Sequence, residues 1–309
     1  MLDRIQAARR ALVLGIGGGG DVVGALAVAR LCEALGTPFA LGGVAWERIP
    51  IDPHPGPRPM AEIEGGRPLG DAAVLASPAT ATPDGTAFSE ARMASHLGAE
   101  TVLVDVSGGA VGAASGIAAA MEALDCDLLV GVDVGGDVLA RGAEPELASP
   151  LCDAVMVAAM LRASLPRDPL LAVIGPGCDG ELTPAEVLAR VAELARAGSW
   201  LGTWGVTPRV AEELEAAASI VPTEASLQVV RAARGETGEH LIRGGRRRVE
   251  LGPMGALAFF FDPATSAGLL PLAEAVSDSA SIEQGRAALA ALGIRTELDY
   301  EREGAAGAS

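Results

Sequence analysis

The sequence lacks lysine altogether: all 23 basic residues of the 309-residue chain are arginine. This absence excludes a P-loop lysine, a Schiff-base lysine and the strand lysine of protein kinases. Any anion must therefore be bound by arginine side chains or by backbone amides. The three histidines, His54, His96 and His240, lie far apart in the sequence, and there is no G-x-S-x-G motif. A standard hydrolase triad is therefore not expected.

Aromatic residues and cysteines are also scarce. Only 3% of the residues are aromatic although 50% are hydrophobic, so the core must consist mainly of Ala, Val and Leu, which suits helices packed on a parallel sheet. The 4 cysteines form no C-x-x-C pair, which argues against disulfides and zinc and fits a reducing cytoplasm. No apolar run reaches the roughly 18–20 residues of a membrane helix, and the N-terminus has no secretory layout. We expect a cytoplasmic protein without a membrane partner.

The net charge of −17 argues against a nucleic-acid-binding surface. The only tight basic run, Arg246, Arg247 and Arg248, lies in a segment that we interpret as a hairpin with an exposed arginine face. The remaining partner class is a small molecule, and a homo-oligomer is also compatible with the sequence.

Short apolar runs alternate with helix-like segments over roughly the first two thirds of the chain. This alternation is typical of βαβ units with a mainly parallel, Rossmann-like sheet, which we expect to form a three-layer α/β sandwich. Such sheets bind their ligands in the loops after the carboxyl ends of the strands. Strands are predicted at residues 11–15, 39–44, 101–106, 127–134 and 170–174, and helices at 21–35, 110–124, 149–165 and 183–197.

The pattern changes after about residue 205, but no clean linker is visible. We interpret residues 1–300 as a single α/β domain, with a βα-repeat core at 1–205 and a C-terminal elaboration at 206–300. Residues 301–309 are expected to form a loose tail. Within the elaboration, helices are predicted at 207–218, 225–234 and 281–292, a hairpin near 239–251 and a strand at 257–261.

The segment 45–90 is rich in proline and glycine and too long for a tight connection. We interpret it as a binding loop, with a plain surface excursion as the alternative, and its first part, 45–70, is a candidate lid. It carries Arg48 and Arg58, either of which could bind a phosphate or carboxylate through two parallel hydrogen bonds.

A glycine loop follows the first predicted strand, and Gly15, Gly17 and Gly20 in it match G-x-G-x-x-G. The bare backbone of this loop is a candidate anion-binding site at the start of a helix. An NAD(P)- or flavin-binding oxidoreductase is one alternative, with Glu47 as the acid for the ribose. Asp21 argues against that alternative, because a carboxylate repels a pyrophosphate unless a cation stands between them. The substrate-binding backbone is assigned to Gly17, Gly18, Gly19 and Gly20.

The Gly-Gly-Asp-Val motif at residues 19–22 recurs at 135–138, again after a predicted strand. If these loops adjoin at one edge of the sheet, Asp21, Asp133 and Asp137 converge. A divalent cation would then turn their mutual repulsion into attraction, and oxygen ligands suit Mg²⁺, Mn²⁺ or Ca²⁺. Helix capping is the alternative explanation for Asp21 and Asp137.

Further polar residues complete the candidate site. Asp105 or Glu224 is a candidate general base, Arg48 a candidate substrate clamp, and Asp179 a candidate substrate-binding residue. Turn formation is the alternative for Asp179, and first-turn helix charge is the alternative for Glu224. These residues together indicate a metal-dependent hydrolase or lyase acting on a small anionic, for example phosphorylated, metabolite. A non-catalytic nucleotide- or metabolite-binding protein is the second alternative.

The motifs LVLGIGGGGDVVGAL, ERIPIDPHPGPR, GVDVGGDVLARGAEPELASPLCDA, GPGCDGEL and VPTEAS occur in this order. Together they resemble the domain-of-unknown-function family 1152 over roughly residues 10–265. This resemblance implies the fold but no activity. The glycine–acid loops alone resemble, more loosely, the D-glutamate cyclase family, whose sites are metal-associated, and this second resemblance transfers no catalytic residue.

Overall fold

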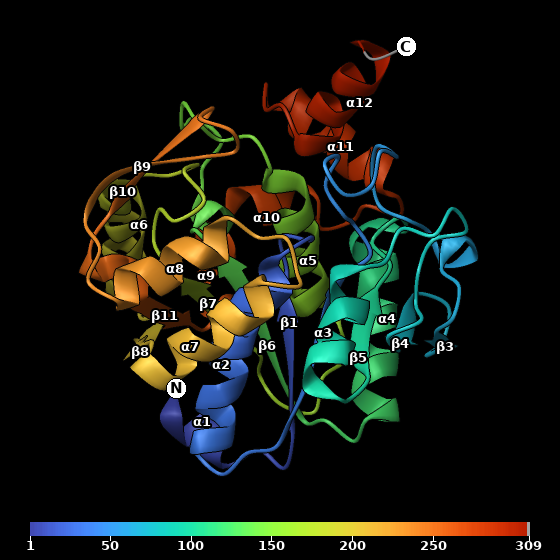
Figure 1. Ribbon diagram of the computed structural model, residues 1–309, viewed down its shortest axis with the longest axis horizontal. Helices are drawn as coiled ribbons and strands as arrows, with labels where there is room; N and C mark the ends of the chain where they lie inside the picture. Colours follow the sequence, from blue (N-terminus) through green and yellow to red (C-terminus); the bar gives the residue numbers. More distant parts are fainter. Residues whose placement is uncertain (308–309) are drawn as a thin grey trace.

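The computed structural model describes residues 1–307 and is built around a nine-stranded sheet (Figure 1). Its centre consists of five parallel strands that are almost entirely buried, as expected for strands covered on both faces. In spatial order these strands are β5 (Thr101–Val104), β2 (Phe39–Val44), β1 (Ala11–Gly15), β6 (Leu128–Val134) and β7 (Leu170–Ile174). The predicted Rossmann-like parallel sheet is therefore confirmed.

Antiparallel strands extend both edges of this parallel centre. On one side lie β4 (Ala73–Ala76) and β3 (Arg67–Pro68), and on the other β11 (Leu257–Phe261) and β8 (Trp200–Gly205). Strand β11 comes from the C-terminal region but inserts between β7 and β8. The predicted hairpin forms a separate two-stranded sheet of β9 (Gly238–Ile242) and β10 (Arg247–Leu251).

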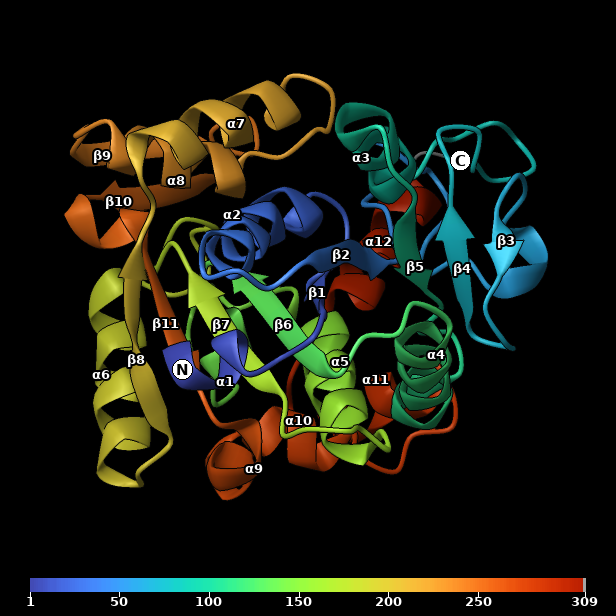
Figure 2. The same ribbon diagram turned by 90° about the horizontal axis from the view of Figure 1, so that it is seen from below.

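Helices cover both faces of the sheet, which gives the predicted three layers (Figure 2). Alternate residues of β1 enter different cores, with Leu12 and Leu14 on one face and Ala11 and Val13 on the other. One face carries α2 (Asp21–Ala34), α3 (Ser89–Leu97), α7 (Pro208–Ala218) and α8 (Ala225–Ala233). The opposite face carries α4 (Gly109–Ala123), α5 (Pro150–Arg162), α6 (Pro184–Arg196), α10 (Pro271–Ala275) and α11 (Ile282–Ala291).

The remaining helices are α1 (Leu2–Gln6), α9 (Pro263–Ser266) and α12 (Glu297–Gly307). Helix α12 corrects the expectation of a loose tail beginning at residue 301. Its residue Glu301 is buried and accepts hydrogen bonds from the Trp46 indole (3.1 Å) and from the Gly56 amide (2.8 Å), which hold the helix against segment 45–70. The last part of the predicted tail, residues 308–309, lies outside the described residues.

Among residues 1–307, no helix combines the length and the apolar character needed to cross a lipid bilayer.

Candidate active site

Carboxylates gather at the carboxyl ends of β1, β6 and β7. The chain leaves β1 toward β2 and later returns to β6 on the other side of β1, so the β1–β6 boundary is the switch point of the parallel strands. Asp21 begins α2 after β1, Asp133 lies near the end of β6, and Asp153 lies in the first turn of α5. The fold therefore brings these three acids to the crevice where such sheets bind ligands.

We call Asp21, Asp133 and Asp153 the β1 triad. One carboxylate oxygen from each residue lies within 4.8 Å of the other two. Asp133 and Asp153 are only 1% and 2% exposed, and within residues 1–307 their Oδ2 and Oδ1 atoms, respectively, have no hydrogen-bond partner. Because a buried oxygen without a donor is costly, this geometry fits a cation that supplies the missing positive charge.

The protonation of the β1 triad reflects this shortage of donors. Burial raises the pKa of Asp21 to about 7, against the effect of the hydrogen bond that the Gly17 amide donates to it. Burial and the neighbouring carboxylates raise the pKa of Asp133 and of Asp153 well above the ordinary value. Without a bound cation, the folded protein therefore holds protons on these groups at pH values where free aspartic acid is ionised.

A second group, which we call the β7 triad, consists of Asp137, Asp179 and Glu181. Its carboxylate oxygens also lie within 4.8 Å of one another, and all three residues are buried. Burial raises the pKa of Asp179 to about 7, and burial and the neighbouring carboxylates raise that of Asp137 well above its ordinary value. The carboxylates of Asp133 and Asp137 influence the pKa of one another, so the two triads interact.

Glu181 of the β7 triad is fully paired. It accepts hydrogen bonds from the Ala148 and Ser149 amides (2.7 and 2.8 Å) and from the Ser149 hydroxyl. The guanidinium groups of Arg243 and Arg247 lie 3.6 and 3.3 Å from its Oε1 atom. The hairpin therefore neutralises Glu181 of the β7 triad with its own arginines.

The structure divides the predicted metal-ligand set between the two triads. Asp21 and Asp133 meet in the β1 triad, whereas Asp137 belongs to the β7 triad. The chain turns between Asp133 and Asp137 through Gly135 and Gly136, which have φ values of 130° and 114°, and this turn carries Asp137 toward the loop after β7. Asp153, which is not among the ligands predicted from the sequence, takes the third place beside Asp21 and Asp133.

Two backbone amides of the predicted anion-binding loop already donate hydrogen bonds to other groups of the protein. The Gly17 amide donates to Asp21 Oδ2 (3.1 Å), and the Gly19 amide donates to the Trp46 carbonyl (2.9 Å). A Cβ atom on Gly17 would lie 2.5 Å from Asp21 Oδ2, and one on Gly20 would lie 2.4 Å from the Cβ atom of Thr223. Close packing by other parts of the chain therefore explains these glycines, and substrate binding by Gly17, Gly18, Gly19 and Gly20 remains a prediction.

Arg48 reaches the site but is already engaged. Its guanidinium group donates a hydrogen bond to the Gly17 carbonyl, lies 3.7 Å from Glu297 Oε1 and 3.6 Å from Glu301 Oε1, and stacks 4.9 Å from the Trp46 ring. These contacts link the glycine loop to α12. Substrate clamping by Arg48 stays a prediction.

The two candidate bases lie outside both triads. Asp105 accepts hydrogen bonds from the Met60 and Ser107 amides at 2.8 and 2.7 Å, and Glu224 accepts one from the Arg243 amide. These contacts position loops and do not favour a catalytic role for either residue, which stays a prediction.

Segment 45–70 is held in place by ion pairs and backbone contacts. Arg58, which the sequence offered as an anion clamp, pairs with both carboxylate oxygens of Asp52 (2.7 and 2.8 Å) and with Glu62 (2.7 Å). The Met60 amide is bonded to Asp105. These contacts hold the segment in one position, and its closure over the site stays a prediction.

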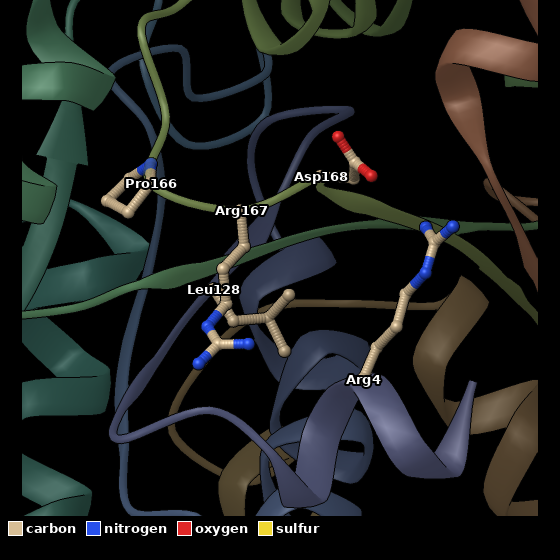
Figure 3. Close-up of a pocket in the computed structure, with 5 residues that line it drawn as sticks. All are labelled: Arg4, Leu128, Pro166, Arg167 and Asp168. Atoms are coloured by element: carbon tan, nitrogen blue, oxygen red, sulfur yellow. The ribbon is translucent and has the colours of Figure 1, made fainter.

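Two hollows lie at opposite edges of the parallel sheet. One of about 690 Å³ borders the β7 triad at Glu181 and the hairpin at Arg246 and Arg248. The other, of about 310 Å³, lies where β6 and β7 begin (Figure 3), and its arginines are paired elsewhere, Arg4 with Asp262 at 2.6 Å and Arg167 with Asp127 at 3.1 Å. Its lining residues are Arg4, Leu128, Pro166, Arg167 and Asp168.

A family model described as "Protein of unknown function (DUF1152)" matches residues 12–305. The match covers nearly the whole chain, including all the acids of both triads and the hairpin. No curated protein and no solved structure matches the chain. The chain therefore belongs to the DUF1152 family, as its motifs led us to expect.

Proposed function

We propose that this protein is a cytoplasmic enzyme that acts on a small anionic metabolite with a divalent cation held by Asp21, Asp133 and Asp153. The observation that supports the proposal most strongly is the pair of buried, unpartnered oxygens on Asp133 and Asp153 at the switch point of the sheet. All the ligands are carboxylate oxygens, which suit Mg²⁺, Mn²⁺ or Ca²⁺. A bound cation of this kind supplies Lewis acidity and lowers the pKa of water.

The chain itself orients the ligands. The Gly17 amide fixes the carboxylate of Asp21, and Glu297 accepts hydrogen bonds from the Leu151 and Cys152 amides (3.0 and 2.8 Å) at the start of α5, next to Asp153. Helix α12 therefore supports the β1 triad from outside, in the way that outer contacts commonly orient metal ligands.

Hydrolysis or elimination suits this site better than covalent catalysis. The chain has no lysine. Burial raises the pKa of the thiol in Cys32, Cys126, Cys152 and Cys178, so none of them is a thiolate at neutral pH. Asp179 can instead exchange a proton near neutral pH, because its pKa is raised to about 7, and it is a candidate acid or base beside the larger hollow.

The contacts of Glu47 favour a cation site over a dinucleotide site. This residue, which the oxidoreductase alternative needs for the ribose, is buried and accepts hydrogen bonds from the Ser89 amide and hydroxyl. Its carboxylate is therefore not free to bind a ligand. A non-catalytic binding protein would use the same cation site, and only turnover separates it from an enzyme.

Calorimetric titration with Mn²⁺ tests the cation site. Wild-type protein should bind Mn²⁺, and Asp153→Asn should lose binding because it removes a charged ligand. Asp127→Asn is the matched control, since Asp127 is also a buried aspartate but lies at the opposite edge, where it pairs with Arg9 and Arg167. Equal Mn²⁺ affinity in wild type and Asp153→Asn would contradict the proposal. Turnover of phosphate esters or hydroxy acids by the Mn²⁺-loaded protein would then separate an enzyme from a binding protein.

A further inference from the structure

The turn of the β9–β10 hairpin carries an arginine that the proposed cation site does not use. Arg243 follows β9 directly and has a φ of 52°, and Gly244 and Gly245 continue the left-handed turn at 64° and 82°. The Arg243 amide donates a hydrogen bond to the Glu224 carboxylate, which ties the turn to the loop before α8. The backbone that carries this guanidinium group is therefore fixed in position.

This guanidinium group reaches toward both triads. It lies 3.6 Å from Glu181 Oε1 in the β7 triad, and its positive charge contributes to lowering the pKa of Asp179 and, in the β1 triad, that of Asp21, which burial raises. The side chain is 40% exposed, whereas that of Glu181 is fully buried. Arg243 thus stands between the carboxylates and solvent.

Arg243 also retains its hydrogen-bond donors. Within residues 1–307 its guanidinium group donates no hydrogen bond, and the contact with Glu181 is an ion pair beyond hydrogen-bond length. The other two arginines near the triads differ from Arg243. Arg48 donates a hydrogen bond to the Gly17 carbonyl, and its Nη1 atom, which has no hydrogen-bond partner among the described residues, is buried between the Trp46 ring and α12. Arg247 lies 3.3 Å from Glu181 and donates to the Glu146 carbonyl (3.2 Å). A guanidinium group with free donors is the side chain best suited to bind a carboxylate or phosphate through two parallel bonds.

We propose that Arg243 binds an oxyanion group of the substrate, a carboxylate or a phosphate, and that it does so only when the β1 triad holds its cation. The inference rests on the proposed function, because the carboxylates of the β1 triad, two of which have an oxygen without a donor in the described part of the chain, would repel an anion near them. A bound cation offsets that repulsion. By linkage, the anion must strengthen cation binding by the same factor by which the cation strengthens anion binding.

The test is a pair of calorimetric titrations of the full-length protein with methyl phosphate and with acetate, each done with and without saturating Mn²⁺. We expect measurable binding of at least one anion in the presence of Mn²⁺ and none in its absence. Arg243→Gln should weaken anion binding by about 10- to 100-fold, the usual effect of losing hydrogen bonds to a charged group. The anion affinity of Arg243→Lys should lie between those of wild type and Arg243→Gln, because lysine keeps the positive charge but lacks the planar guanidinium group.

Arg234→Gln is the control, since Arg234 lies at the C-terminal end of α8, lines neither hollow, and has a side chain that is 45% exposed and paired with Glu215. It should bind both anions as wild type does. All variants should bind Mn²⁺ alone with wild-type affinity, which also shows that they are folded.

Three results would overturn the inference. Anion binding without Mn²⁺ would contradict the coupling between cation and anion binding. Equal anion affinity in Arg243→Gln and wild type would show that Arg243 does not bind the anion. Absence of anion binding to the Mn²⁺-loaded wild type would contradict the proposed oxyanion site. Each of these leaves the cation site intact, whereas failure of Mn²⁺ to bind the wild type would overturn the proposed function and this inference together.

Discussion

The β1 triad and the β7 triad have nearly the same composition and adjoin at the same edge of the sheet, yet the chain treats them differently. The β7 triad receives backbone amides and two arginines: Glu181 takes both arginines and two amides, and Asp179 accepts a hydrogen bond from the Glu181 amide at 3.2 Å. The β1 triad keeps two buried oxygens without a donor. A cluster of buried acids therefore indicates a cation site only where the fold has not already supplied the compensating charge.

This difference originates in distant parts of the sequence. Residues 238–251 fold back as the hairpin and bring arginines to the β7 triad. Helix α12 instead brings the acid Glu297 to the region of the β1 triad, where it accepts hydrogen bonds from the backbone at the start of α5 and lies 3.7 Å from Arg48. The protein thus fixes the position of Asp153 without neutralising it.

The largest effect is expected from Gly17→Ala. The added Cβ atom would lie 2.5 Å from Asp21 Oδ2 and 3.1 Å from Asp153 Oδ2, so both carboxylates must move. We expect Mn²⁺ affinity to fall by about 100-fold in calorimetry, an effect at the upper end of those seen when metal ligands are misplaced. Gly112→Ala is the control, because a Cβ atom there meets nothing within 4 Å, and it should bind Mn²⁺ as wild type does. Unchanged affinity in Gly17→Ala would show that the β1 triad is not the cation site.

Removing one charge from each triad should change stability in opposite directions. In metal-free protein at pH 8, Asp153→Asn removes an uncompensated buried acid and should raise the free energy of unfolding by on the order of 1–2 kcal/mol. Glu181→Gln removes the acceptor of several charge-assisted hydrogen bonds and should lower it by about 2 kcal/mol. Urea denaturation measures both changes. The same sign for both variants would mean that the two triads do not differ as described.

The pH dependence of stability should also separate the triads. Asp21 and Asp179, one from each triad, have a pKa of about 7 in the folded protein, against 3.8 ordinarily. The folded state therefore holds more protons than the unfolded state, so stability is fully present below about pH 4 and is lost as the pH rises toward 7, by up to about 1.4 kcal/mol per pH unit for each group.

Saturating Mn²⁺ should remove the contribution of Asp21 to this slope and leave that of Asp179. Urea denaturation between pH 4 and pH 8, with and without the ion, measures both slopes. A slope that Mn²⁺ leaves unaltered would argue against a cation at the β1 triad.

The sequence predicted the parallel sheet well because its strands are short apolar runs, and all but β2 are followed by glycine within a few residues. The sequence also predicted that Asp21 and Asp133 lie close together, since Asp21 begins the helix after β1, Asp133 lies near the end of β6, and these two strands prove to be neighbours. Strand β8 was missed because its sequence, WLGTWG, contains two glycines and resembles a turn.

The rest of the site depends on contacts that no local pattern encodes. Asp153 reaches Asp21 only through the fold of the connection between β6 and α5, and the pairing of Glu181 depends on a hairpin about 60 residues away. Helix α12 has a weakly apolar sequence rich in charge, and its buried contacts with Trp46 and Gly56 identify it as part of the structure.

The smallest effect is expected at Asp105, an acid outside both triads that is paired with backbone amides as Glu181 is. In Asp105→Asn, an amide group replaces one oxygen and faces either the Met60 or the Ser107 N–H group. The loss should be about 1 kcal/mol of unfolding free energy in urea, because one hydrogen bond is broken. Mn²⁺ affinity should equal that of wild type, since Asp105 belongs to neither triad. A large loss of Mn²⁺ binding without a loss of stability would place Asp105 in the cation site and would mean that pairing with backbone amides does not distinguish structural acids from ligands.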